Sequence, residues 1–91
     1  MKYFDWDNEK NEKLKSERDV GFEDILMAIE VGDILDILEN LNKEKYPNQK
    51  VFVIKIENYA FIVPFVEDKE KVFLKTIIPS RKATKKYLIK K

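Results

Sequence analysis

Residues 51–66 decide the fold, and they read Val51-Phe52-Val53-Ile54-Lys55-Ile56-Glu57-Asn58-Tyr59-Ala60-Phe61-Ile62-Val63-Pro64-Phe65-Val66. Both halves of this stretch are rich in β-branched and aromatic residues, which is typical of β-strands. The polar pair Glu57-Asn58 ends the first strand and predicts a tight turn, so we expect two adjacent antiparallel strands. The second strand is apolar on both faces, as expected of a central strand that helices cover on one side. Pro64 cannot donate a ladder hydrogen bond and therefore predicts a bulge or an exposed edge.

The first part of the chain predicts one strand and a polar helix. Residues 1–6 have the character of a short edge strand. Asp7 or Asn8 can cap a helix that extends to Arg18, because each offers a side-chain oxygen to the free amides of the first turn. This helix is almost wholly polar, so we expect it to contact the core through few residues and to leave a broad face in solvent.

A second helix is marked by an apolar stripe at positions i, i+3, i+4 and i+7. The stripe is formed by Phe22, Ile25, Leu26 and Ile29. Gly32 predicts the end of this helix, since glycine readily takes the left-handed conformation that follows a helix. Residues 34–38 then predict a short strand, and Tyr46-Pro47-Asn48 predicts a turn in the loop that follows.

The end of the chain predicts one more strand and a basic helix. The charged run at residues 67–70 is typical of a hairpin turn, and residues 71–78 predict a third long strand that Pro79 ends. Ser80 can cap a short terminal helix whose basic residues face solvent. Residues 1–91 are therefore expected to form a single α+β domain. An N-terminal strand and two helices pack on one face of an antiparallel sheet, and a short basic helix follows.

Composition excludes several classes of active site. The 91 residues contain no cysteine and no histidine, which rules out disulfides, thiol nucleophiles, Ser-His and Cys-His catalysis, and zinc sites of the usual kind. The acidic residues are too scattered to predict a metal cage, so we expect neither a metal nor a cofactor. No apolar run approaches the roughly 18 residues of a membrane span, and we expect a cytoplasmic protein with no membrane partner.

Charge is divided unevenly along the chain. Residues 1–44 hold 13 acidic and 6 basic residues, a net charge of −7. Residues 45–91 hold 12 basic and 4 acidic residues, a net charge of +8, and the two sum to the formal +1 of the whole chain. A basic half that follows an acidic half points to a polyanionic partner for the basic half.

Two short motifs bracket nearly the whole chain. Near the start stands Phe4-Asp5-Trp6-Asp7, followed by Lys10, Val20 and Phe22-Glu23, and near the end stands Ile77-Ile78-Pro79-Ser80-Arg81-Lys82-Ala83-Thr84. Together they resemble the family of BrnT toxins, which open with Phe-Glu-Trp-Asp and close with a strand that runs into Ile-Ser-Ala-Arg-x-Ala-Ser/Thr. The resemblance implies a RelE-like fold, ribonuclease activity on messenger RNA, and a type II toxin that a small ribbon-helix-helix antitoxin neutralises. It allows a hetero-oligomer or a dimer.

Ribonuclease chemistry without histidine requires arginine, lysine, glutamate or tyrosine. The 2′-OH of RNA attacks the neighbouring phosphate, and the protein must position the backbone, stabilise the crowded phosphate and move protons. Arg81 is the first candidate, because a guanidinium grips two phosphate oxygens and Arg81 lies where a strand ends and a helix begins. The resemblance adds Arg18 and Lys75. At these places Glu17-Arg18-Asp19 stands where the family has Lys-His-Gly, and Thr76, with Lys75 beside it, stands where the family has an arginine.

Four lysines are expected to hold the RNA backbone, namely Lys55, Lys82, Lys85 and Lys86. Glu57 is a candidate base and Tyr87 a candidate proton donor. Each assignment has an ordinary structural alternative. The lysines can form a solvated helix or strand face, Glu57 can be a surface carboxylate, and Arg81 can be a structural or interface arginine.

Three functions stay open at this level. The chain can be a metal-independent endoribonuclease toxin of the BrnT type. It can be a catalytically inactive RelE-like module that binds an antitoxin or nucleic acid, as the replacement at Glu17-Arg18-Asp19 permits. It can also be a small domain of unrelated role whose basic end binds nucleic acid or an acidic protein. For the first two, the charges predict that an acidic antitoxin segment competes with RNA for residues 81–86.

Overall fold

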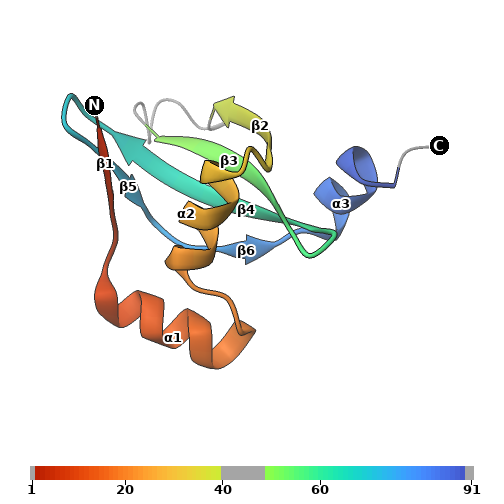
Figure 1. Cartoon of the computed structure of the whole chain (residues 1–91), viewed down its shortest axis with the longest axis horizontal. Helices are drawn as coiled ribbons and strands as arrows, with labels where there is room; N and C mark the ends of the chain where they lie inside the picture. Colours follow the sequence, from red (N-terminus) through yellow and green to blue (C-terminus); the bar gives the residue numbers. More distant parts are fainter. Residues whose placement is uncertain (1, 40–48, 90–91) are drawn as a thin grey trace.

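The computed structural model describes residues 2–39 and 49–89, and the turn predicted at Tyr46-Pro47-Asn48 lies outside these ranges. The described residues form a six-stranded sheet with three helices (Figure 1). The strands are β1 (Tyr3–Asp5), β2 (Ile34–Glu39), β3 (Gln49–Ile56), β4 (Tyr59–Glu67), β5 (Lys71–Leu74) and β6 (Ile78–Pro79), and the helices are α1 (Asn8–Arg18), α2 (Phe22–Glu30) and α3 (Arg81–Tyr87). The α+β class predicted from the sequence is confirmed.

The sheet is antiparallel except at one edge. Its strand order is β1-β5-β4-β3-β2, and β6 also pairs with β4. β1 is an edge strand, as predicted, but it runs parallel to β5 with Phe4 opposite Val72. The sheet is therefore mixed rather than wholly antiparallel. A parallel pair needs a long connection between its strands, and the chain from α1 to β4 provides it.

The β3–β4 hairpin is the centre of the sheet, as residues 51–66 predict. Its register runs without a shift from Gln49 opposite Val66 to Ile56 opposite Tyr59. The turn residues Glu57 and Asn58 have φ angles of 51° and 66°, both in the left-handed region that a type I′ turn requires at its two central positions. The turn predicted at this pair is confirmed, and its backbone twist suits the strands it joins.

The prediction of a third long strand over residues 71–78 is wrong, because the hydrogen-bond ladder to β4 breaks opposite Pro64. The chain forms two short strands, β5 and β6, with residues 75–77 between them. The Lys75 N–H donates to the carbonyl of Pro64 at 2.8 Å, but proline has no N–H with which to return the bond. The β3–β4 register passes Pro64 without a bulge. The disruption predicted from Pro64 thus appears in its partner strand.

The predicted helix boundaries are set by the expected caps. Oδ1 of Asp7 accepts two first-turn amides of α1 at 2.9 and 3.5 Å. Gly32, with a φ of 86°, follows α2 in the left-handed region. Oγ of Ser80 accepts the amide of Ala83 at 3.0 Å and so caps α3.

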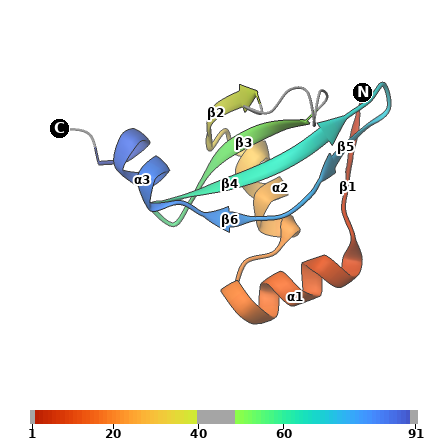
Figure 2. The same ribbon diagram turned by 180° about the vertical axis from the view of Figure 1, so that it is seen from behind.

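Helices α1 and α2 cover one face of the sheet, and α3 covers part of the other. α2 crosses in front of the strands in Figure 1 and lies behind them in Figure 2. The core on that face is formed by Leu14, Val20, Phe22, Ile25, Ala28, Phe52, Ile54, Val63, Phe65, Val72, Leu74 and Ile77. A separate small cluster on the opposite face joins Val53, Ala60 and Ala83, with Tyr87 and Leu88 packed against it. No helix within residues 2–39 and 49–89 has the length and apolar character needed to cross a membrane.

Candidate nucleic-acid interface

α3 is the most basic element of the described structure. Its seven residues include four cations and no acid in the first turn, and the cations form two pairs with the i, i+4 spacing of one helix face. These pairs are Arg81 with Lys85, and Lys82 with Lys86. All four side chains are exposed. None of them forms an ion pair with any residue that the structure describes. The prediction that the basic residues of this helix face solvent is confirmed.

The position of α3 is fixed by its buried side. Ala83 and Thr84 are buried. The Thr84 hydroxyl donates to the carbonyl of Ser80 at 2.8 Å and accepts the N–H of Ala60 in β4 at 2.9 Å. The Ser80 N–H donates to the Ala60 carbonyl at 3.0 Å. These bonds hold α3 against the end of β4, so the orientation of its four cations is set by the sheet.

A groove of about 180 Å³ lies between α3 and the sheet, and we call it the α3 groove. It is lined by Leu38, Val53, Ile62, Ser80, Lys82, Ala83, Lys86 and Tyr87. One cation pair, Lys82 with Lys86, therefore lines this groove. The other pair, Arg81 with Lys85, does not line it and lies about 100° away around the helix.

The Tyr87 hydroxyl is already engaged at one wall of this groove. It donates to Oδ2 of Asp36 at 2.7 Å, and Oδ1 of Asp36 accepts the N–H of Ile37 at 2.8 Å. The hydrogen bond to Asp36 raises the pKa of Tyr87. The same bond, together with the Ile37 amide, lowers the pKa of Asp36. A tyrosine with a raised pKa is a weaker acid, so this arrangement does not favour Tyr87 as a proton donor.

Arg18 lies elsewhere, in an acidic setting. Its Nη1 donates to the carbonyl of Ile77 at 2.8 Å, which ties the end of α1 to the break between β5 and β6. Arg18 also lines a groove of about 250 Å³, which we call the Arg18 groove. The other lining residues are Asp19, Val20, Asp24, Ile56, Glu57, Tyr59 and Phe61. One arginine among three carboxylates leaves a formal charge of 1 − 3 = −2, which disfavours a phosphate there.

The two remaining predicted cations, Lys75 and Lys55, lie at separate places. Lys75 is exposed in the break between β5 and β6. Lys55 is half-buried, its N–H donates to the Asp33 carbonyl at 3.0 Å, and it lines a third groove of about 190 Å³ beside α2. None of the three grooves described above is lined by more than one of Arg18, Lys75 and Arg81. The candidate base Glu57 lines the Arg18 groove and the third groove, beside one predicted cation in each. Among the described elements, only α3 brings several of the predicted cations together. In the described ranges no three acidic side chains gather closely enough to hold a metal ion.

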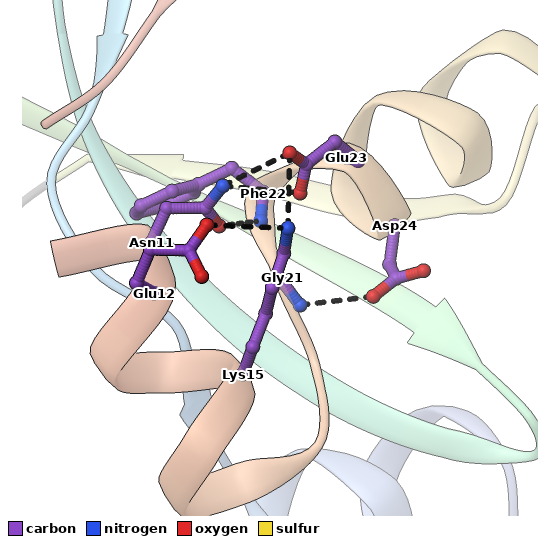
Figure 3. Close-up of polar contacts among 7 residues, drawn as sticks. All are labelled: Asn11, Glu12, Lys15, Gly21, Phe22, Glu23 and Asp24. Carbon is purple, nitrogen blue, oxygen red and sulfur yellow. Dashed lines mark hydrogen bonds and ion pairs between the residues drawn. The ribbon is translucent and has the colours of Figure 1, made fainter. Parts of the chain in front are cut away.

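A buried polar network joins α1 to α2, and the sequence did not predict it. Asn11 is only 2% exposed; its Oδ1 accepts the N–H of Phe22 at 2.8 Å, and its Nδ2 lies 3.1 and 3.0 Å from the two carboxylate oxygens of Glu23 (Figure 3). Nζ of Lys15 reaches Glu23 at 3.3 Å. We call these side chains, with the Gly21 backbone beside them, the Asn11 network. Its only sequence signal is that Asn11 lies three residues before the buried Leu14.

The network perturbs two pKa values. The Asn11 amide is the main reason that the pKa of Glu23 is lowered, and Lys15 adds to the effect. The bond to Glu23 in turn raises the pKa of Lys15. Both effects favour the charged forms, so the network is a structural connection between the helices rather than a source of proton transfer.

The candidate interface is therefore α3 with the sheet face beside it. Its charges are concentrated and exposed, whereas Arg18 and Lys55 line separate grooves, each beside Glu57, and Lys75 lies in the break between β5 and β6. Comparisons of the chain with protein-family models, with curated proteins and with solved structures found no match.

Proposed function

We propose that this protein is the toxin component of a type II toxin–antitoxin system of the BrnT type. It acts in the cytoplasm as a metal-independent endoribonuclease that cleaves RNA and so inhibits translation and growth. Its partners are RNA and a small ribbon-helix-helix antitoxin. The observation that carries the proposal is α3, whose four exposed cations have no ion-pair partner among the described residues and whose buried side is held against β4. The two end motifs and the α+β fold support it.

The pair Arg81 and Lys85 is the part of α3 best suited to phosphate. Both side chains are exposed and lie outside the α3 groove. The Arg81 guanidinium would donate two parallel hydrogen bonds to the phosphate that the 2′-OH attacks and would stabilise its additional negative charge. Lys85, one turn along the helix, would hold the neighbouring backbone as a point charge. Arg18 is better suited to holding α1 against the sheet, because its guanidinium already bonds Ile77.

A second candidate is a non-catalytic module that binds an antitoxin or nucleic acid through the same fold. The observation that favours it is the Arg18 groove. Arg18 is the only cation at the position where BrnT toxins have Lys-His-Gly, and here it bonds the backbone within an acidic groove. Under this alternative α3 still binds its partners, but no bond of RNA is broken.

The proposal is tested by growth and RNA integrity after induction in a bacterial host. The wild type is compared with Arg81→Ala and with Lys69→Ala, a matched control that removes an exposed cation from the turn between β4 and β5. We expect growth arrest and fragmented RNA from the wild type and the control. For purified Arg81→Ala we expect an RNA cleavage rate about 10²–10³ times lower, the usual cost of losing one charge-stabilising donor.

The other outcomes separate the alternatives. Equal arrest by Arg81→Ala would remove Arg81 from the mechanism while the toxin assignment stands. A wild type that is well expressed and folded but neither arrests growth nor cleaves RNA would contradict the toxin and favour the non-catalytic module.

A further inference from the structure

The face of the sheet that carries α3 is largely aliphatic beyond the helix. Strand register places Leu38, Val51 and Pro64 in one row across the sheet, and Val53, Ile62 and Ile78 in the next, with Asp36 at the β2 end of that second row. Residues opposite one another in a register have side chains on the same face. Leu38 and Ile78 are 41% and 43% exposed, while Val51, Ile62 and Pro64 are half-buried. α3 covers only the part of this face near Val53 and Ala60, so the two rows leave an open aliphatic floor.

The border of this floor is positively charged. Lys82 and Lys86 line the α3 groove from one side of the helix, and neither has an ion-pair partner among the described residues. Nζ of Lys86 lies 5.3 Å from the Tyr87 ring centroid. The Asp36 carboxylate at this wall accepts hydrogen bonds from the Tyr87 hydroxyl and the Ile37 amide, and the positive charge of Lys86 contributes to the lowered pKa of Asp36. The surface therefore combines an apolar floor with two exposed lysines at its edge that have no ion-pair partner among the described residues.

This chemistry discriminates between two kinds of polyanion. Single-stranded RNA binds through bases stacked on aromatic side chains together with a basic groove. The floor here is aliphatic, and the one aromatic side chain that lines the α3 groove, Tyr87, has its hydroxyl bonded to Asp36 and lies beside the Lys86 ammonium. A protein segment with an apolar stripe and flanking carboxylates matches both the floor and the lysines.

We propose that the α3 groove and the aliphatic floor beside it dock an acidic amphipathic segment of a partner protein. Apolar side chains of the segment cover Leu38 and Ile62, and its carboxylates pair with Lys82 and Lys86. RNA is held instead by the other pair, Arg81 and Lys85. The two partners then use adjacent sides of one helix, in place of the direct competition for residues 81–86 expected from the sequence. The inference rests on the proposed function for the identity of the partner, but the surface itself can be tested without it.

The test measures binding to the folded protein by fluorescence anisotropy. The first probe is a labelled peptide of about 18 residues, five helical turns, with leucine at i, i+3, i+4 and i+7 and glutamate at the other positions. A second peptide has the same composition in an order that breaks the apolar stripe. The third probe is an oligouridylate of about 20 nucleotides.

Two double variants on the same helix serve as matched controls for each other. Lys82→Glu with Lys86→Glu reverses the pair that lines the groove, and Arg81→Glu with Lys85→Glu reverses the other pair by the same charge. We expect the first double variant to weaken binding of the striped peptide at least tenfold and the second to weaken it less than about threefold. For oligouridylate we expect the opposite order. Leu38→Asp should weaken binding of the striped peptide and leave binding of oligouridylate unchanged. Circular dichroism verifies that each variant is folded.

Three results would overturn the inference. The first is equal binding of the striped and the reordered peptide, which would mean that the peptides bind through their net charge and not through the apolar stripe. The second is an equal response of both probes to both double variants, or oligouridylate binding that depends on the groove pair. The third is no binding of the striped peptide at about 100 μM, roughly −5.5 kcal/mol. None of these readouts depends on growth arrest, so failure of the ribonuclease proposal and failure of this surface are distinguishable.

Discussion

Replacing Asn11 by alanine should destabilise the fold strongly although the residue lies in a polar helix. Its Oδ1 is the acceptor for the buried N–H of Phe22, the first residue of α2. Its Nδ2 donates to the Glu23 carboxylate. Because Asn11 is 2% exposed, water cannot take the place of the lost amide without rearrangement. The change therefore leaves a backbone donor unsatisfied at the start of α2.

The expected loss follows from these contacts. An unsatisfied buried donor costs about 1–3 kcal/mol, and the lost bond to the exposed Glu23 carboxylate adds a fraction of that because solvent screens it. We expect a loss of about 2 kcal/mol in the free energy of unfolding, against the total of about 5–15 kcal/mol that is usual for a small domain. For a chain of this length the melting temperature should fall by about 8–16 °C.

The assay is guanidinium denaturation followed by circular dichroism, with Asn8→Ala as the control. Asn8 is an exposed asparagine at the first position of the same helix, and its replacement should change stability by less than about 0.5 kcal/mol. An NMR titration provides a second readout, since Asn11→Ala removes the main cause that lowers the Glu23 pKa, which should rise toward its ordinary value of 4.5. A loss below about 1 kcal/mol for Asn11→Ala, or an equal loss for Asn8→Ala, would refute the reasoning.

Three further predictions concern other parts of the molecule. Gly21→Ala should cost about 1–3 kcal/mol, because a Cβ there would lie 2.7–2.9 Å from side-chain atoms of the Asn11 network; an unchanged denaturation midpoint would contradict this. Glu57→Asn with Asn58→Gly should stabilise the β3–β4 hairpin by about 1 kcal/mol, because both positions have φ > 0, and a lower midpoint would argue against the turn geometry. The pKa of Asp36 is lowered mainly by its bond from Tyr87, so the stability from this bond is present above the ordinary pKa of 3.8 and is lost as pH falls through the lower folded value. The free energy of unfolding of Tyr87→Phe should therefore be lower than that of the wild type at pH 7, and the two values should converge in strong acid. A difference in stability that does not change with pH would be inconsistent with an ionised Asp36 as the acceptor.

The parts of the fold that depend on residues close together in the chain could be predicted from the sequence. The caps at Asp7 and Ser80, the stop at Gly32 and the turn at Glu57-Asn58 all reflect preferences of one or a few residues, and the structure confirms each. The prediction of one long strand over residues 71–78 was wrong because it depended on a distant segment. Its break is imposed by Pro64 in another strand, whose missing N–H matters only because the two segments meet.

The candidate site shows the same division. The cations of α3 could be found from the basic cluster at residues 81–86, but their separation into a pair that lines the groove and a pair outside it depends on which side of the helix packs on β4. Arg18 could be noted as a cation, yet its bond to Ile77 joins residues 59 positions apart. Asn11 carried almost no signal, because a buried asparagine is indistinguishable in sequence from an exposed one.

By itself the sequence determined the helices, most of the strands, the central hairpin and the charge available to a partner, because periodicity, capping and turn preferences act over a few residues. The tertiary structure alone decided the parallel β1–β5 pair, the face that α3 covers, the acidic setting of Arg18 and the open aliphatic floor. These features arise from contacts between distant segments. Such contacts depend on which surfaces the whole chain can bury together while its backbone groups stay paired.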